Sequence, residues 1–155
     1  MRSRASSVST ARSLIVDFCV ISTHMAAAPH LLEERIRVLV ADDEKLFVEL
    51  VEAMLTTDPR IAVVARAYNG REAVERALEL EPDVTLMDIA MPELDGIQAI
   101  GEIRAADPVA CILVLTGGNN PADIDLARKA GAAGYLTKDR IATELLPTIH
   151  DLGSR

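Results

Sequence analysis

The chain has 155 residues, 50% of them hydrophobic and 26% charged, which fits one packed domain and excludes a chain too polar to fold. Its two cysteines, Cys19 and Cys111, make neither a disulfide framework nor a metal-binding pair, and no apolar run approaches the roughly 20 residues of a membrane helix. The net charge is −8, and residues 1–30 contribute +2 to it through three arginines and one aspartate, so residues 31–155 carry −10. A body this acidic repels phosphates and is a poor non-specific binder of nucleic acid.

The N-terminal segment, residues 1–33, differs from the rest in composition. An Arg- and Ser-rich start is followed by an apolar stretch over residues 14–21, which resembles a secretory signal. Asp17, however, places a charge inside an apolar centre only eight residues long. We therefore favour a disordered extension or a misassigned start, with Met25 as the natural first residue, and expect the folded domain over residues 34–152.

The first half of this domain alternates short apolar runs with amphipathic segments. Residues 36–41 form a short β-branched run that predicts a buried strand, and residues 61–67 predict a second strand. Between them a helix ends at Asp58-Pro59, and a second helix covers residues 72–80. The buried faces of the two helices are expected to be Phe47, Leu50, Val51, Met54 and Leu55 in the first, and Ala73, Ala77 and Leu80 in the second.

The second half repeats the alternation. Strands are predicted over residues 84–87, 111–115 and 135–136, with helices between and after them. Asp95 is expected to cap the third helix, and Asn120 the fourth, with Pro121 as its first residue. The last helix covers about residues 142–152, although Pro147 favours a later start. The inward residues are expected to be Ile97, Ile100 and Ile103 in the third helix, and Leu145, Leu146, Ile149 and Leu152 in the last.

This order of elements predicts the fold class. Five strands alternating with five helices indicate an α/β protein with a doubly wound, five-stranded parallel sheet covered by helices on both faces. Right-handed crossovers leave few topologies for such a chain.

Polar residues follow the strands of the predicted sheet. Asp42 and Asp43 follow the first strand, Asp88 ends the third, Thr116 ends the fourth and Lys138 follows the fifth. Ligands of open α/β sheets bind beyond the carboxyl ends of the strands. We therefore expect these five side chains to converge at one edge.

Three carboxylates held close together repel one another, by roughly 4 kcal/mol for a pair about 4 Å apart at an effective dielectric constant near 20. Either a raised pKa or a bound hard cation relieves that repulsion. Oxygen-only ligands favour magnesium, manganese or calcium over zinc. An acidic site with a nearby lysine therefore indicates phosphate chemistry.

Four motifs stand at these strand ends: Val38-Leu-Val-Ala-Asp-Asp-Glu44, Leu86-Met-Asp-Ile-Ala-Met-Pro-Glu-Leu-Asp-Gly96, Val114-Leu-Thr-Gly117 and Gly134-Tyr-Leu-Thr-Lys-Asp139. In this order the chain resembles the receiver domains of two-component response regulators, which have a flavodoxin-like fold, over about residues 36–152. The chain has no proline after Lys138, and in this it resembles receivers that carry a C-terminal helix-turn-helix domain. DNA binding does not carry over to this chain without that domain.

The resemblance implies a role for each site residue. Asp88 would accept a phosphoryl group from the phosphohistidine of a histidine kinase. Asp42, Asp43, Asp88 and the backbone carbonyl of Ala90 would hold Mg2+. Thr116 and Lys138 would each contact a phosphoryl oxygen, and Tyr135 would move inward as Thr116 shifts.

The resemblance implies a regulatory phosphoacceptor switch rather than an enzyme, which works in the cytoplasm and in transcription regulation. Its implied partners are a histidine kinase and either a downstream protein or a C-terminal output domain, with pairing to a second copy and no direct contact with nucleic acid or membrane. Two alternatives stay open: an interaction module that takes no phosphate, and a magnesium-dependent phosphohydrolase. The second is disfavoured because Ala90 stands where such an enzyme typically carries a second acid. His24, His30 and His150 are expected to have no role, and Cys111 to lie in strand core.

Overall fold

The structure is a computed structural model, and it describes residues 34–154. The predictions for residues 1–33, including Met25 as a start and the histidines His24 and His30, lie outside the described residues. Within them, no helix is both long and apolar enough to cross a bilayer.

Five parallel strands form one sheet in the order β2-β1-β3-β4-β5. The strands are β1 (Ile36–Ala41), β2 (Ile61–Ala67), β3 (Val84–Asp88), β4 (Ile112–Thr116) and β5 (Gly134–Thr137). The chain returns across β1 before adding β3, so β1 and β3 are neighbours where the winding direction reverses. The predicted doubly wound parallel sheet is confirmed.

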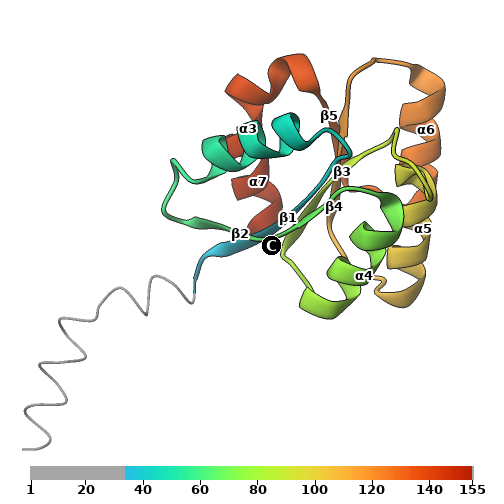
Figure 1. Cartoon of the computed structure of the whole chain (residues 1–155), viewed down its shortest axis with the longest axis horizontal. Helices are drawn as coiled ribbons and strands as arrows, with labels where there is room; N and C mark the ends of the chain where they lie inside the picture. Colours follow the sequence, from blue (N-terminus) through green and yellow to red (C-terminus); the bar gives the residue numbers. More distant parts are fainter. Residues whose placement is uncertain (1–33, 155) are drawn as a thin grey trace, which may run out of the picture. The chain divides into compact units, whose positions relative to one another are not determined.

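Helices cover both faces of the sheet (Figure 1). They are α3 (Lys45–Leu55), α4 (Gly70–Leu80), α5 (Gly96–Ala106), α6 (Pro121–Ala130) and α7 (Ile141–Gly153), with a short 3-10 turn η1 (Lys138–Arg140) before the last. Successive side chains of a strand point to opposite faces, so Val38 and Val40 pack with α3 and α7, whereas Leu39 and Ala41 pack with α4 and α5. Two apolar cores therefore hold the central strands from both sides.

The starts of the helices follow from capping chemistry. Asp95 accepts a hydrogen bond from the backbone N–H of Gln98, and Asn120 accepts one from Ala122, with Pro121 as the first residue of α6. Both predicted caps are confirmed. Gly96 opens α5 directly against the end of β3, where a Cβ would lie 2.0 Å from the carbonyl oxygen of Asp88. Only glycine allows α5 to begin so close to that strand.

The buried face of α3 differs from the prediction. Val48, Val51 and Leu55 are buried, whereas Leu50 is 52% exposed and Phe47 is only partly buried. The apolar positions of this helix span a wider arc than the sheet can cover, so Leu50 was wrongly assigned to the core. Cys111 likewise lies just before β4 and is partly buried rather than central.

Smaller differences concern α4, α5 and α7. Val74 is buried in α4 where Leu80 was expected, Ile97 is only partly buried at the start of α5, and Leu146 is only partly buried in α7. Each of these residues lies at the margin of the face that its helix turns toward the sheet.

Pro147 lies in the interior of α7, because that helix begins at Ile141 rather than near the proline. Proline has no N–H to donate to the carbonyl of Thr143, and its ring crowds that carbonyl. The apolar contacts of Leu145 and Ile149, both fully buried, hold the helix across this defect.

His150 has a partner that the sequence did not reveal. Its Nε2 lies 2.6 Å from Oδ2 of Asp58, in the turn between α3 and β2. Asp58 also binds the guanidinium and the backbone N–H of Arg60. These contacts, those of Arg60 first, hold the pKa of the Asp58 carboxyl well below its usual range. The expectation that His150 has no role is wrong, because it ties α7 to this turn.

Replacing Pro147 by alanine should stabilise the protein. Pro147 is exposed, so the substitution removes little packing and restores the helical N–H. We expect the free energy of unfolding in urea to rise by roughly 1–3 kcal/mol. Ala142→Pro serves as a control, because it places a proline at an exposed position in the first turn of the same helix. It should lower the free energy of unfolding far less than a second proline in the helix interior would. A Pro147→Ala protein no more stable than the parent would contradict this account of α7.

The Asp58 contacts should make stability depend on acid pH. A carboxyl whose pKa is lowered by folding stabilises the native state above its unfolded pKa, and that stabilisation is lost as the pH falls through the folded pKa. The difference in unfolding free energy between the parent and Asp58→Asn should therefore shrink progressively as the pH falls below about 5. Urea unfolding at several pH values measures it, and a difference that stays constant over this range would show that the carboxylate charge contributes nothing.

Candidate functional site

The strand register brings the predicted site residues to one edge of the sheet. Ala41 of β1 pairs with Met87 of β3, so Asp42 and Asp88 are the next residues on neighbouring strands. Asp88 pairs with Leu115 of β4, which places Thr116 one step further along that strand. Thr116 in turn pairs with Thr137 of β5, and Lys138 follows directly. Residues from four strands thus meet through backbone pairing alone.

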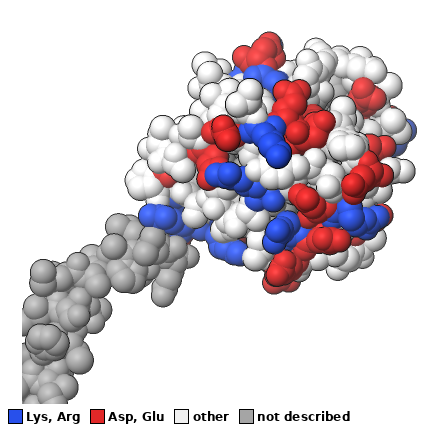
Figure 2. Space-filling model, in the orientation of Figure 1, with Lys and Arg blue, Asp and Glu red and all other residues white. Residues whose placement is uncertain are grey.

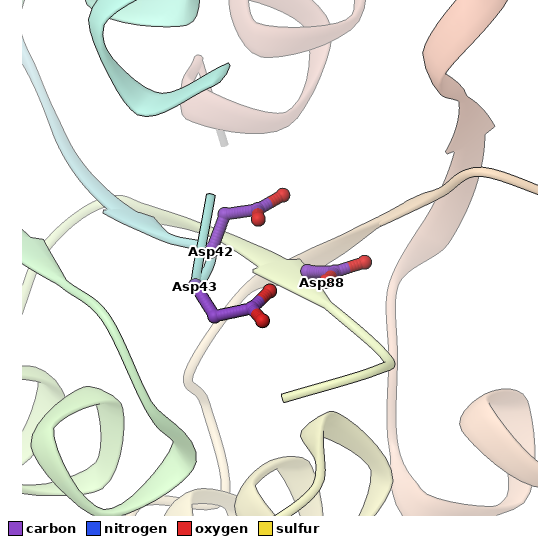
Figure 3. Close-up of side chains that lie close together, drawn as sticks. All are labelled: Asp42, Asp43 and Asp88. Carbon is purple, nitrogen blue, oxygen red and sulfur yellow. The ribbon is translucent and has the colours of Figure 1, made fainter. Parts of the chain in front are cut away.

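Three carboxylates form the centre of this edge. Each of Asp42, Asp43 and Asp88 offers an oxygen, and these oxygens all lie within 4.8 Å of one another. Their carboxylates extend into the same space from the ends of β1 and β3 (Figure 3). Asp42 and Asp88 are buried and Asp43 is exposed, so the group opens to solvent on one side.

Lys138 supplies positive charge to the two buried carboxylates. Its Nζ lies 2.6 Å from Oδ2 of Asp42 and 3.6 Å from Oδ1 of Asp88, and its side chain is 19% exposed. The other oxygen of Asp42 accepts a hydrogen bond from the backbone N–H of Glu44 at 2.9 Å. Asp42 is therefore engaged at both oxygens, whereas Asp88 has the longer contact with the lysine.

Because Lys138 lies closer to Asp42 than to Asp88, the negative charge of Asp88 is less well compensated. Burial raises the pKa of its carboxyl to about 6, with further upward contributions from the charges of Asp42 and Asp43. Lys138 and the backbone N–H of Ile89 oppose that rise. For Lys138, burial by itself favours the neutral amine, but the hydrogen bond to Asp42 and the charge of Asp88 outweigh burial, and its pKa is raised.

The donor set fits a hard divalent cation. It consists only of carboxylate oxygens, three of them within reach of one ion, and one of the three carboxylates faces solvent. Three anionic groups with one ammonium leave negative charge uncompensated, which a cation would neutralise. Mg2+ in particular keeps several waters and needs only one or two protein carboxylates, which suits an open group of this kind.

Thr116 and Tyr135 lie beyond this centre. The hydroxyl of Thr116 donates to the carbonyl of Gly118 at 3.0 Å and accepts from its N–H at 3.2 Å, so it is bound within its own loop. Tyr135 is 45% exposed on β5 and lines two hollows, of about 610 and 420 Å³. Ala90 is exposed in the loop after β3 and brings no side-chain polar atom.

The sequence did not predict one neighbour of the site. The Nζ of Lys138 lies over the ring of Phe47, 4.1 Å from its centroid. The helical pattern assigned Phe47 to the core, and nothing in its spacing indicated an ammonium from the far end of the chain.

Comparisons with known proteins agree with this geometry. A family model described as the response regulator receiver domain matches residues 38–150. Protein-glutamate methylesterase/protein-glutamine glutaminase 5 of Geobacter metallireducens is 44% identical over 109 residues, which are 69% of this chain and 30% of that protein. The transcriptional regulatory protein LnrK of Bacillus subtilis is 37% identical over 121 residues, 76% of this chain and 55% of that protein.

Among solved structures, the signal receiver domain of NarL from Mycobacterium tuberculosis superposes with a TM-score of 0.75 at 35% identity, and the match covers 78% of this chain and 98% of that one. The chain spans less than two thirds of the length of either curated relative. The family match covers most of the chain, so the protein belongs to the response regulator receiver domains, the phosphoacceptor switches of two-component signalling.

Proposed function

We propose that Asp88 is the residue that accepts the phosphoryl group, from the phosphohistidine of a histidine kinase. The observation that carries this proposal is the unequal engagement of the three carboxylates. Asp42 is bound at both oxygens by Lys138 and Glu44, and Asp43 is exposed to water. Asp88 is buried, lies 3.6 Å from the ammonium, and has an elevated pKa that marks an undercompensated carboxylate.

The chemistry is an in-line displacement at phosphorus. An oxygen of the Asp88 carboxylate forms the new O–P bond as the P–N bond to the donor histidine breaks, and the bonding electrons leave with the imidazole nitrogen. The Lys138 ammonium, already between Asp42 and Asp88, neutralises a phosphoryl oxygen in the transition state. Because the pKa of Asp88 is about 6, its carboxyl is mostly ionised and nucleophilic near neutral pH.

We propose Mg2+ as the cofactor, held by Asp42, Asp43, Asp88 and the backbone carbonyl of Ala90. When bound, the ion supplies positive charge to the phosphoryl oxygens beyond what one lysine provides. The oxygen-only donor set supports this assignment.

Thr116 is the proposed link between phosphorylation and response. Its hydroxyl is bound to Gly118 here, and a phosphoryl group on Asp88 offers a stronger, charged acceptor. A phosphoryl group that binds the rearranged loop better than this one shifts the population toward that arrangement. Tyr135 then moves inward from its exposed position between the two hollows, and the surface of α6, β5 and α7 changes.

We propose residues 34–152 as the bounds of the receiver domain, and a histidine kinase and an output protein or domain as its partners. The curated relatives include a methylesterase and a transcriptional regulator, so regulation of transcription and of an enzyme are both candidate outputs. Acidic and basic side chains lie intermixed over the face in Figure 2, which favours a protein partner, including a second copy, over direct nucleic-acid contact. We propose the cytoplasm as its compartment, where ATP-dependent kinases work.

Phosphorylation tests the assignment of Asp88. Incubation with Mg2+ and acetyl phosphate should add one phosphoryl group by intact mass, and Asp88→Asn should abolish the gain. Asp95→Asn, which replaces one helix-capping side chain by another and makes the same change from carboxylate to amide, serves as the matched control and should still be phosphorylated. A folded, Mg2+-binding protein that gains nothing would favour an interaction module, and release of phosphate over many turnovers would favour a phosphohydrolase.

The same substitution should stabilise the metal-free protein. Folding raises the pKa of Asp88 to about 6, so the ionised carboxylate destabilises the native state above that pH and the effect disappears below the unfolded value. In EDTA near neutral pH, Asp88→Asn should raise the free energy of unfolding by about 1–3 kcal/mol. In saturating Mg2+ the advantage should shrink, because the parent gains more from binding the ion. A variant equal to or less stable than the parent in EDTA would contradict the repulsion inferred here.

A further inference from the structure

We infer that Phe47 is a positioning residue, whose ring holds the ammonium of Lys138 in place for transfer of the phosphoryl group to Asp88. This inference rests on the proposed function of Asp88 and adds a residue from α3 to its site.

The contact joins two distant parts of the chain. Phe47 lies in the first turn of α3, and Lys138 follows the edge strand β5 at the start of η1. The Nζ of Lys138 is 4.1 Å from the centroid of the ring, well within the range over which an aromatic face attracts a cation. With Asp42 at 2.6 Å and Asp88 at 3.6 Å, the ring completes the surroundings of a side chain that is 19% exposed.

An aromatic face suits a lysine that must change partners. Lysine carries a compact charge on a flexible four-carbon stem, so its position depends on what surrounds the ammonium. Here the ammonium is bound closely to Asp42, and a phosphoryl group on Asp88 would require it to shift toward new oxygens. A π face attracts a cation without fixing the direction of its N–H groups, so Lys138 can move between acceptors while the ring still holds it.

The alternative is that Phe47 only fills space. It is partly buried and packs against the core beneath α3, where Val48 and Val51 are fully buried. A leucine or methionine of similar size would serve that purpose equally well.

Fluorinated phenylalanines at position 47 separate the two accounts. One, two and three ring fluorines weaken the π face progressively with little change in size. The rate of phosphorylation by acetyl phosphate at saturating Mg2+ should fall stepwise, by about 3- to 10-fold across the series. The rate of Phe47→Leu should fall at least as far, whereas Phe47→Tyr and Phe47→Trp should keep a rate within about twofold of the parent.

The chain offers a matched control. Lys45 lies over the ring of Tyr68, at 5.6 Å from its centroid, and this pair shares no residue with the lysine–ring contact of Lys138 and Phe47. Tyr68→Leu removes an aromatic ring and one lysine–ring contact but should leave the phosphorylation rate unchanged. If the fluorinated series and Phe47→Leu react at the parental rate with native urea unfolding curves, Phe47 is packing alone and the inference is overturned.

A second measurement needs no phosphorylation. NMR relaxation of the ε-methylene of Lys138 reports how firmly the side chain is held in the unphosphorylated protein. The order parameter should fall in the trifluorinated and Phe47→Leu proteins and stay high in Phe47→Tyr. If the parent accepts no phosphoryl group, the proposed function fails, but this measurement still tests the contact between Phe47 and Lys138. An unchanged order parameter in the trifluorinated protein overturns the inference. A lowered order parameter supports the positioning contact.

Discussion

The mutual repulsion of three carboxylates at the junction of β1 and β3 is the constraint on which the site depends. Backbone pairing leaves Asp42 and Asp88 no freedom to separate, because they continue neighbouring strands whose preceding residues are locked in register. One ammonium serves both, and it is committed more closely to Asp42 than to Asp88. Asp88 is left undercompensated, so the same imbalance that weakens the metal-free fold favours binding of a cation and suits the nucleophilic role proposed for this residue.

The fold holds this arrangement rigid where rigidity matters. The central strands are packed from both faces by separate apolar cores, and α5 begins so close to β3 that the residue at its start has no room for a Cβ. The loop that follows Asp88 is therefore pinned between its own strand and the next helix. Asp43 and Ala90, by contrast, are exposed, which leaves one side of the pocket open to a donor and to water.

Local pattern was enough to predict the elements and the residues at their ends. The run over Ile61–Ala67 is β-branched and bounded by breakers, so its limits could be read directly, and Asp42, Asp88 and Lys138 followed from the rule that parallel strands present their ends together. The errors concern contacts between distant segments. Leu50 fits the helical period but lies outside the arc that the sheet covers, and His150 pairs with a residue 92 positions away. The lysine–ring contact of Phe47 depends in the same way on how α3, packed on β1 and β2, lies relative to the end of β5, which periodicity does not encode.

The parts of the structure that are free to move determine how a change at the pocket could reach the surface. Leu113, Val114 and Leu115 of β4 are almost completely buried, and a close-packed core does not deform continuously. A pull on Thr116 is therefore relieved toward the loop of Gly117 and Gly118, which are exposed and carry no side chain to be repacked. Because Thr116 pairs with Thr137, beside Lys138 and two residues after Tyr135, one phosphoryl group that engages both Thr116 and Lys138 acts on adjacent strands at the edge of the sheet. On the switch mechanism proposed for Thr116, the response is therefore expected on the face of α6 and β5 rather than across the molecule.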